Sequence, residues 1–292
     1  MKRRQVLQSL GGALLGWPLA ARRAWSEPKG PRKILFFSRS ALFEHPVIRR
    51  EGGQLSFAEK ALVQMARQID CTVDCTRDGR VFERDLDAYA AVVSYTCGRP
   101  EHLLKPIPAD GQDGNHPLSE TGWKNLDAAV RGGKPLVAVH PGIWLLPDAA
   151  GADCLGHGSQ QVARIKVVAP RFPGAEKLGE SFSMFEEWFS LMRFAKDLHV
   201  VLVQDCARMD KKAEADRRCY DRPPFPCTWA RLHGKGRVFY TSLGHREDVW
   251  SSKIFEQILL GGLSWALGRI PADITPNLDR AAPQANEFMK PV

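Results

Sequence analysis

Four short hydrophobic runs in the first half of the chain, separated by polar and amphipathic stretches, constrain the fold most strongly. They occupy residues 33–37 (KILFF), 71–75 (CTVDC), 90–95 (AAVVSY) and 135–139 (PLVAV). Runs of this length are typical of strands, and the nearly continuous ones are typical of strands buried on both faces. Between them, residues 57–69 have the spacing of an amphipathic helix, residues 83–87 are compatible with a helix, and residues 119–131 predict a helix closed by two glycines. This alternation predicts an α/β fold, with a mainly parallel sheet and helices on both faces.

The second half of the chain is less regular. Strands are predicted at residues 162–168 and 200–203, a hairpin at 227–232 and 237–241, and a long helix at 254–267. From residue 271 the tail is rich in Pro, Asn and Asp, and we expect it to drape over the surface. Because no internal repeat interrupts this order, we predict one domain with insertions over residues 33–270, followed by a tail over 271–292.

The first 26 residues have the composition of an export signal. They contain no acidic residue, and their basic residues are Lys2, Arg3, Arg4, Arg22 and Arg23. Residues 6–21 are apolar but too short and interrupted to span a bilayer comfortably, and Arg3-Arg4 resembles the twin-arginine signal of Tat substrates. We expect residues 1–26 to be a Tat signal peptide cut near Ser26, and residues 27–32 to be a linker. The mature protein is then periplasmic or secreted, with no stable membrane anchor; an uncleaved or amphipathic helix is the alternative.

Charge and motifs exclude several classes of partner. Five of the 41 basic residues lie in the leader, which leaves 36 against 33 acidic residues, a net charge of +3, on the mature chain. A protein this close to neutral lacks the basic surface that nucleic acid needs. The chain also has no Walker A loop, no G-x-G-x-x-G after its first predicted strand, no G-x-S-x-G and no H-E-x-x-H. We therefore expect no nucleic acid and no nucleotide as its partner.

The seven cysteines do not form a recognisable metal or redox motif. No C-x-x-C pair is present, so neither a zinc ribbon nor a thioredoxin-like site is supported. In an oxidising compartment an odd number leaves at least one thiol unpaired. Cys206, Cys219 and Cys227 bracket a charged insertion, and disulfides among them could hold it in place.

Three histidines follow predicted strands directly and are the best candidates for chemistry. His140 ends the fourth hydrophobic run, His245 follows the second strand of the hairpin, and His45 follows the first run. Ligands of open α/β sheets bind at the carboxyl ends of the strands. We therefore expect His140 and His245 to lie on neighbouring strands at one crevice, where imidazole can serve as acid, base or metal ligand. A structural role is the alternative for each, and His102, His116, His199 and His233 are expected at ordinary surface or strand positions.

Two adjacent carboxylates precede two aromatic residues at residues 186–189 (EEWF). If this segment is extended, neighbouring side chains point in opposite directions, so only Glu186 or Glu187 can enter a given site. We expect Glu187 to approach the histidines from a loop. A carboxylate beside aromatics can act as a general base, and Trp188 could stack on the face of a sugar. A solvated loop is the alternative.

These features resemble the ThuA-like (trehalose-utilisation) family. Residues 33–48 (KILFFSRSALFEHPVI) are similar to the family's opening, and the later matching segments follow in the family's order at residues 132–141, 156–161, 186–189 and 231–250. The resemblance covers about residues 33–268. It implies a flavodoxin-like three-layer sandwich of the class I glutamine amidotransferase-like type. It also implies a role in carbohydrate catabolism linked to trehalose and 3-keto-sugars.

The resemblance also excludes one reaction. True amidotransferases carry a nucleophilic Cys at the strand-to-helix elbow, where this chain has His140, so we expect no glutamine amidotransferase activity. His157 stands where the family usually has a His-Pro pair, and here it precedes Gly158 instead. His140, His157 and His245 are then the candidate ligands of a divalent metal.

Together these observations predict an exported enzyme that acts on a glycoside or 3-keto-glycoside, as a hydrolase or lyase, by acid/base or metal-assisted chemistry. The expected catalytic residues are His140, His245 and Glu187, and the expected substrate-binding residues are His45, Trp188 and Glu186. The expected partner is a small carbohydrate, and a divalent metal is the one cofactor considered. The alternative is a non-catalytic carbohydrate-binding or accessory module on the same fold.

Overall fold

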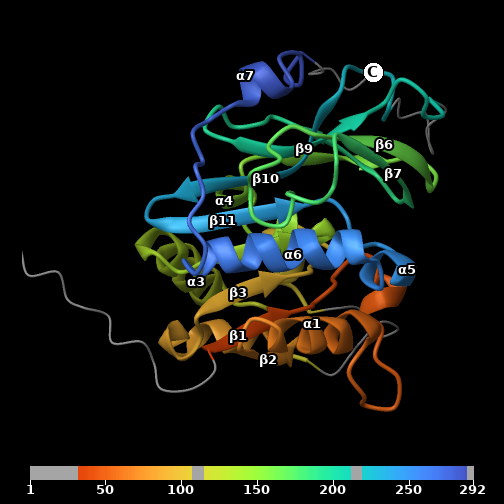
Figure 1. Ribbon diagram of the computed structural model, residues 1–292. Helices are drawn as coiled ribbons and strands as arrows, with labels where there is room; N and C mark the ends of the chain where they lie inside the picture. The colour runs from red at the N-terminus through yellow and green to blue at the C-terminus, as the bar shows by residue number, and fades with distance from the viewer. Residues whose placement is uncertain (1–31, 107–114, 212–218, 288–292) are drawn as a thin grey trace, which may run out of the picture. The chain divides into compact units, whose positions relative to one another are not determined.

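A mixed sheet forms the centre of the fold (Figure 1), and within the residues that the structure describes it has nine strands in the order β2-β1-β3-β4-β11-β10-β9-β6-β7. The computed structural model describes residues 32–106, 115–211 and 219–287. The expected signal peptide, nearly all of the linker and residues 212–218 of the charged insertion lie outside these ranges. The strands of the parallel half are β1 (Arg32–Phe37), β2 (Cys71–Thr76), β3 (Ala91–Ser94), β4 (Leu136–Val139) and β11 (Gly236–Thr241).

The antiparallel half continues the sheet from β11. Its strands are β10 (Phe225–His233), β9 (His199–Asp205), β6 (Gln161–Val167) and β7 (Ser181–Glu186), each antiparallel to its neighbours. The predicted hairpin is formed by β10 and β11, with Gly234 in the left-handed conformation at its turn. A smaller antiparallel sheet pairs β5 (Asp153–His157) with β8 (Phe189–Met192).

Helices cover both faces of the sheet, as predicted. One face carries α1 (Phe57–Arg67), α5 (Glu247–Trp250) and α6 (Lys253–Ala266), and the other carries α3 (Glu120–Gly132). The remaining short helices are α2 (Pro100–Leu103), α4 (Pro147–Ala150) and α7 (Leu278–Ala281). Alternate residues of β1 serve the two faces: Ile34 and Phe36 pack in one hydrophobic core, Leu35 and Phe37 in the other. This double burial explains why the four residues after Lys33 in the run KILFF are all apolar.

The connection between β2 and β3 differs from the prediction. Two 3-10 turns, Gly79–Glu83 and Leu86–Ala88, replace the α-helix expected near residues 83–87. Asp78 and Asp85 each accept a hydrogen bond from the backbone N–H two residues further on. Such local bonds compete with helix formation and favour tight turns.

The tail from residue 271 does not only lie on the surface, as the sequence led us to expect. The side-chain amide of Asn277 bonds to both the N–H and the carbonyl of Val200 in β9, at 2.6 and 3.0 Å. Leu278, Ala282 and Ala285 are buried in the larger hydrophobic core. The described part of the tail is therefore fixed to β9, an inner strand of the sheet, and adds to the larger core.

The expectation of disulfides around the charged insertion is wrong. All seven cysteines lie in described segments, and all seven are free thiols. Cys206, Cys219 and Cys227 are buried. The described end of the insertion is held instead by Tyr220, whose hydroxyl contacts the carbonyl of Trp188, and by Arg222, which donates to Ser190 Oγ and Ala285 O.

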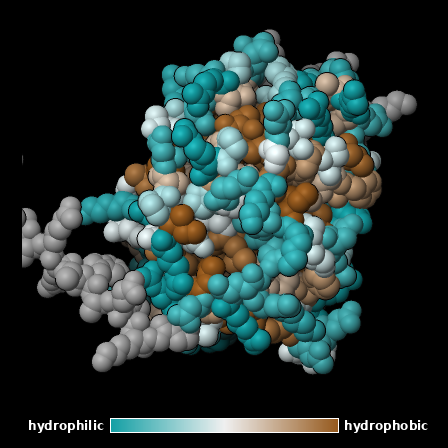
Figure 2. Space-filling view, in the orientation of Figure 1, coloured by the Kyte–Doolittle hydropathy of each residue, from teal (hydrophilic) through white to brown (hydrophobic). Residues whose placement is uncertain are grey.

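The surface of the domain is mixed. On the face shown in Figure 2, hydrophobic residues reach the surface in separate patches among mainly hydrophilic ones. Within the described segments, no helix combines the length and the apolarity that crossing a bilayer requires.

Candidate functional site

His140 stands at a sharp turn at the carboxyl end of β4. Its φ of 49° is unusual for a residue with a side chain, and a 3-10 turn (His140–Trp144) begins directly at it. Gly142 makes this turn possible, because a Cβ at that position would lie 2.1 Å from the carbonyl oxygen of Ser94. The turn places the fully buried imidazole of His140 over the edge of the sheet.

His245 reaches the same place from β11. Because β11 is the parallel neighbour of β4, the chain leaves both strands at the same edge. Gly244 turns the chain with a φ of 119°, and the imidazole centres of His140 and His245 then lie 5.4 Å apart. This is the convergence that the sequence predicts for these two residues.

His45 joins them from the loop after β1. Its ring centre lies 5.1 Å from that of His140 and 5.0 Å from that of His245. Tyr95, which follows β3, lies at the same edge, 5.4 Å from His45 between ring centres. Burial, helped by the nearby His140 and His245, lowers the pKa of His45 well below its usual value. His45 is therefore neutral at physiological pH.

Glu187 supplies the carboxylate at the centre of this group. It lies in the turn between β7 and β8, as expected for an approach from a loop. One carboxylate oxygen lies 3.5 Å from His140 Nε2 and 3.3 Å from His245 Nδ1, and the other lies 3.6 Å from His157 Nδ1. Burial alone would raise the pKa of Glu187, but the proximity of His140 and His245 outweighs it and holds the pKa far below its usual range.

Glu186 contacts the backbone of the loop that carries His245 and is not among the four grouped side chains, which fits the prediction that only one of the two glutamates enters the site. Its fully buried carboxylate accepts hydrogen bonds from the backbone N–H groups of Gly244 and His245, at 2.6 and 2.7 Å, and from that of Glu187. Burial raises its pKa, against these hydrogen bonds and the charge of His140. Glu186 thus orients the loop that carries His245, and its burial leaves no surface for the substrate contact expected of it.

Trp188 does not offer a face to a ligand in this structure. Its side chain has 0% exposure, packs in the larger hydrophobic core, and donates from Nε1 to the carbonyl of Gln161 at 3.0 Å. The sequence pattern placed an aromatic near the carboxylate correctly, but tertiary packing buries it. Phe189 instead stacks on His140, with 4.1 Å between ring centres.

Phe43 is an aromatic residue at the site that the sequence reasoning missed. It is 56% exposed, and its ring meets that of His45 edge to face at 5.1 Å between centres. The available signal was an apolar pair, Leu42-Phe43, in an otherwise polar loop just before His45. Exposed large apolar side chains next to a buried polar group are typical of a binding surface.

The donor atoms of this group fit a metal ion. Among the described residues, His45, His140, Glu187 and His245 each offer one ligand atom, and these atoms lie within 4.8 Å of one another. His45 Nδ1, His140 Nε2 and His245 Nδ1 are buried and have no hydrogen-bond partner. Three imidazoles and one carboxylate form a ligand set that suits zinc and other first-row divalent ions, and they suit calcium or magnesium poorly.

The outer nitrogens of two of these histidines have partners of their own. His140 Nδ1 lies 2.8 Å from the carbonyl oxygen of Ser242. Because a carbonyl only accepts, Nδ1 carries the proton and Nε2 has a free lone pair. His245 Nε2 lies 3.0 Å from the side-chain amide of Gln160, which also accepts from Arg246. His157, the third metal candidate from the sequence, is 38% exposed and lies beside Glu187 but outside the four-residue group.

Comparisons with known proteins agree on the fold. Two crystal structures of proteins described as ThuA-like, from Bacteroides uniformis and Parabacteroides merdae, superpose with TM-scores of 0.59 and 0.58 at 16% and 15% identity. The first alignment covers 86% of this chain and 95% of the relative, and the second covers 84% and 93%. At such low identity the likeness shows the fold alone.

A comparison with curated proteins gives no match. The model of the ThuA family, described as trehalose utilisation, matches residues 33–266, which is most of the chain and all of the strands that carry the site. The chain is a member of the ThuA (trehalose utilisation) family.

Proposed function

We propose that this protein is a metal-dependent enzyme that acts on a neutral glycoside or 3-keto-glycoside. The observation that carries the proposal is the set of three buried imidazole nitrogens without hydrogen-bond partners around the carboxylate of Glu187. Buried polar atoms normally find a partner, and unpaired ones call for a missing water or ion. Membership of the trehalose-utilisation family supports a carbohydrate as the substrate.

The protonation states of the ligands are set by their second contacts. Ser242 fixes the proton of His140 on Nδ1, which leaves Nε2 free to bind a cation. For His245 Nδ1 to bind a cation, Nε2 must carry the proton, and Gln160 must then turn its amide oxygen toward the ring. Glu187 supplies the carboxylate, which a bound cation would keep ionised. The site thus offers one negative charge and neutral imidazoles to a divalent ion.

The bound ion would act as a Lewis acid that polarises a sugar carbonyl or hydroxyl. Proton transfer then falls to His157, because it is the half-exposed histidine beside Glu187 and is not one of the four ligands. Next to a polarised 3-keto group, the C2–H bond becomes acidic. If His157 takes this proton, the electron pair of the C2–H bond forms the C1–C2 double bond as the C1–O bond breaks. The protonated His157 then returns its proton to the leaving alkoxide, so the products are the unsaturated keto-sugar and an alcohol. Hydrolysis would result if a water molecule then added across the C1–C2 double bond, with its hydroxyl on C1 and its proton on C2.

Substrate contact is assigned to Phe43 in place of Trp188. An exposed ring beside His45 can pack on the C–H face of a sugar whose polar edge faces the metal ligands. With a mature net charge of +3 and no phosphate-binding loop, a neutral carbohydrate is favoured over a phosphorylated one. Export by the Tat route places this activity in the periplasm or outside the cell.

Metal analysis tests the proposal directly. The protein purified without chelator, and the stripped protein reloaded with Zn²⁺, Mn²⁺, Fe²⁺, Co²⁺ or Ni²⁺, should each contain about one ion per chain. His245→Ala and Glu187→Gln should lose most of this ion. His233→Ala is the matched control, because His233 is equally buried but pairs with Asp127 away from the site. Stoichiometric metal that survives both site variants overturns the assignment.

Activity is tested on a panel of glycosides and 3-keto-glycosides. Chelation should abolish turnover and the same ion should restore it, whereas His157→Ala should lower kcat by about 10²–10⁴-fold and keep the metal. A protein that binds metal and sugar but turns over no member of the panel is the accessory module considered as the alternative.

A further inference from the structure

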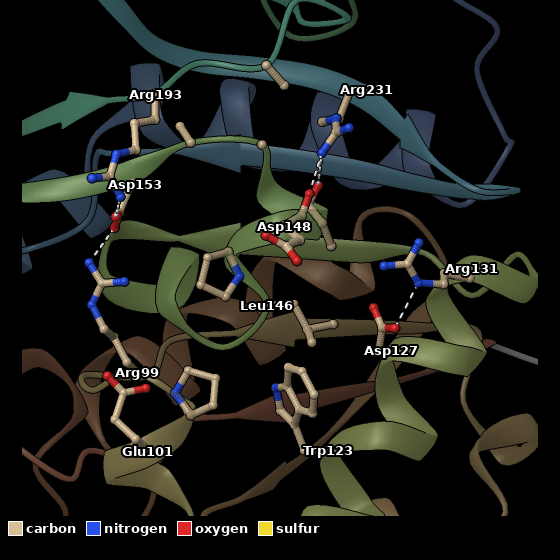
Figure 3. A pocket seen from close by; sticks show the side chains of 16 residues that line it. Arg99, Glu101, Trp123, Asp127, Arg131, Leu146, Asp148, Asp153, Arg193 and Arg231 are labelled. Atoms are coloured by element: carbon tan, nitrogen blue, oxygen red, sulfur yellow. Dashed lines mark hydrogen bonds and ion pairs between the residues drawn. The ribbon is translucent and has the colours of Figure 1, made fainter. Parts of the chain in front are cut away.

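A second pocket lies away from the four metal ligands and has a different chemistry. Its volume is about 550 Å³, within the range of roughly 300–1,000 Å³ that is usual for small-molecule sites. Residues from α2, α3, α4, β10 and the segments beside β5 and β8 line it, and none of them is a candidate ligand or His157. We call it the arginine pocket, after Arg99, Arg131, Arg193 and Arg231, which project into the view in Figure 3.

Charge in the arginine pocket is balanced. Arg99 and Arg193 lie on either side of Asp153, at 2.5 and 3.5 Å, and Arg131 pairs with Asp127 one helical turn away at 2.8 Å. Within the described ranges, the lining residues carry as many carboxylates as guanidinium groups. The lining therefore has no large net field to attract a phosphate, but it presents fixed donors beside fixed acceptors. Hydroxyl groups, which both donate and accept, match such an array.

The floor of the arginine pocket is apolar. Trp123 and Leu146 stand between the Arg99 and Arg131 sides of the pocket (Figure 3). The indole of Trp123 is held in place because Nε1 donates to the carbonyl of Leu145 at 3.0 Å. A sugar ring has hydroxyls at its edge and C–H groups on its face. It would use the ion pairs and the indole at the same time.

The polar wall is also held rigid before any ligand binds. Arg231 donates to the carbonyls of Asp148 and Ala149, at 2.6 and 3.0 Å, and pairs with Asp197 at 2.9 Å. Gly151 leaves room for it, since a Cβ there would lie 2.9 Å from the Arg231 side chain. A preorganised wall reduces the entropy lost on binding.

We propose that the arginine pocket is a second binding site, separate from the metal centre, for a neutral saccharide unit. The balanced ion pairs, the fixed indole and the volume all point to this class of ligand. The site does not depend on the metal. It would let the protein hold one part of a carbohydrate, or a separate sugar, while the metal centre acts elsewhere.

Saturation-transfer NMR with the full chain tests this, using trehalose, maltose and methyl glucoside as probes. Trp123→Ala and Asp153→Asn should weaken binding of at least one probe about tenfold. Lys124→Ala is the matched control, because Lys124 lies on the same helix and is exposed outside the pocket. If Trp123→Ala does not fold, Trp123→Phe keeps an aromatic ring and should keep part of the signal.

The two sites are told apart with crossed variants. His245→Ala should lose the metal and keep the Trp123-dependent saccharide signal, whereas Trp123→Ala should lose that signal and keep the metal. A saccharide signal that vanishes in His245→Ala but survives Trp123→Ala and Asp153→Asn overturns the second site and leaves the metal centre standing. So does binding limited to phosphorylated or acidic sugars, or no binding of any probe to the unaltered chain.

Discussion

At the scale of single residues, the turn after β4 depends on the absence of a side chain at Gly142. A Cβ there would meet the Ser94 backbone, which belongs to the neighbouring strand β3 and has little freedom to move. The position of the His140 imidazole therefore rests on the residue two places after it. Other glycines, such as Gly132, have open space where a Cβ would lie, so the same substitution should have a different effect at each position.

Gly142→Ala should destabilise the protein by about 1–3 kcal/mol or more, because the clash is with backbone. Gly132→Ala at the end of α3 is the matched control: nothing lies within 4 Å of its Cβ, so it should be neutral or stabilise by up to about 1 kcal/mol. Urea unfolding measures both. Equal effects of the two changes would contradict this account of the turn.

Trp188 and Phe43 give a second contrast between residues. Trp188→Ala should cost about 3–5 kcal/mol, because it empties a fully buried site. Phe43→Ala should cost about 0.5 kcal/mol or less, because the ring is largely exposed, and should raise KM for the sugar. Urea unfolding and steady-state kinetics distinguish them. A stable Trp188→Ala protein with weakened sugar binding would restore the role that its sequence suggests.

At the scale of elements, α1 is tied to the sheet by one buried carboxylate. Glu59 closes a capping box with Ser56, accepts from Ser38 Oγ at the end of β1, and forms a bidentate pair with Arg50. Burial would raise the pKa of Glu59, but the Arg50 pair and the backbone bond from Ser56 lower it below the usual value. The Glu59 carboxylate thus bonds to the start of α1 through Ser56, to the end of β1 through Ser38, and to the loop after His45 through Arg50.

Glu59→Ala should destabilise the protein by about 2–4 kcal/mol, because it removes the buried carboxylate that accepts from Arg50, from Ser38 and from the Ser56 backbone in the capping box. Lys124→Ala, which breaks the exposed pair with Glu120, should cost less than about 1 kcal/mol.

Because the folded state lowers the Glu59 pKa, the contribution of Glu59 to the free energy of unfolding is complete above about pH 4.5 and is lost as pH falls through the folded pKa. The stability gap between the unaltered chain and Glu59→Ala should shrink below pH 4.5. A gap independent of pH would contradict the charge argument.

At the scale of the whole molecule, the site depends on strand order more than on any one element. The four candidate ligands follow β1, β4, β7 and β11, and only the last two of these strands lie in the second half of the chain. β11 is the junction of the sheet, because it pairs parallel with β4 and antiparallel with β10. It brings His245 to His45, His140 and Glu187 and joins the two halves of the sheet.

The proposed export concerns the whole chain, and the expected Tat signal lies outside the described residues. Arg3→Lys together with Arg4→Lys keeps the positive charge but removes the twin-arginine pair, so unprocessed protein should accumulate in the cytoplasm. Cell fractionation and the mass of the protein measure this. Unchanged export of the double variant, or of the unaltered chain in a strain without the Tat translocase, would rule out this route.

The sequence by itself determined the features that depend on local chemistry. The runs at residues 33–37 and 135–139 predicted buried strands, and residues 119–131 with the two glycines after them predicted α3. Because parallel strands end at one edge, it also predicted that His140 and His245 converge. Hydrophobic runs, caps and turn glycines act over a few residues, so they can be read without the rest of the chain.

Only the tertiary structure decided which side chains become buried and which share a site. It made Glu186 a buried acceptor of backbone N–H groups, enclosed Trp188 in the core, and brought the exposed ring of Phe43 against His45. It also arranged β10, β9, β6 and β7 in an order that their sequences do not encode locally. Burial and proximity arise from contacts between segments far apart in the chain. Each such contact depends on the packing of all the others, and no local pattern records it.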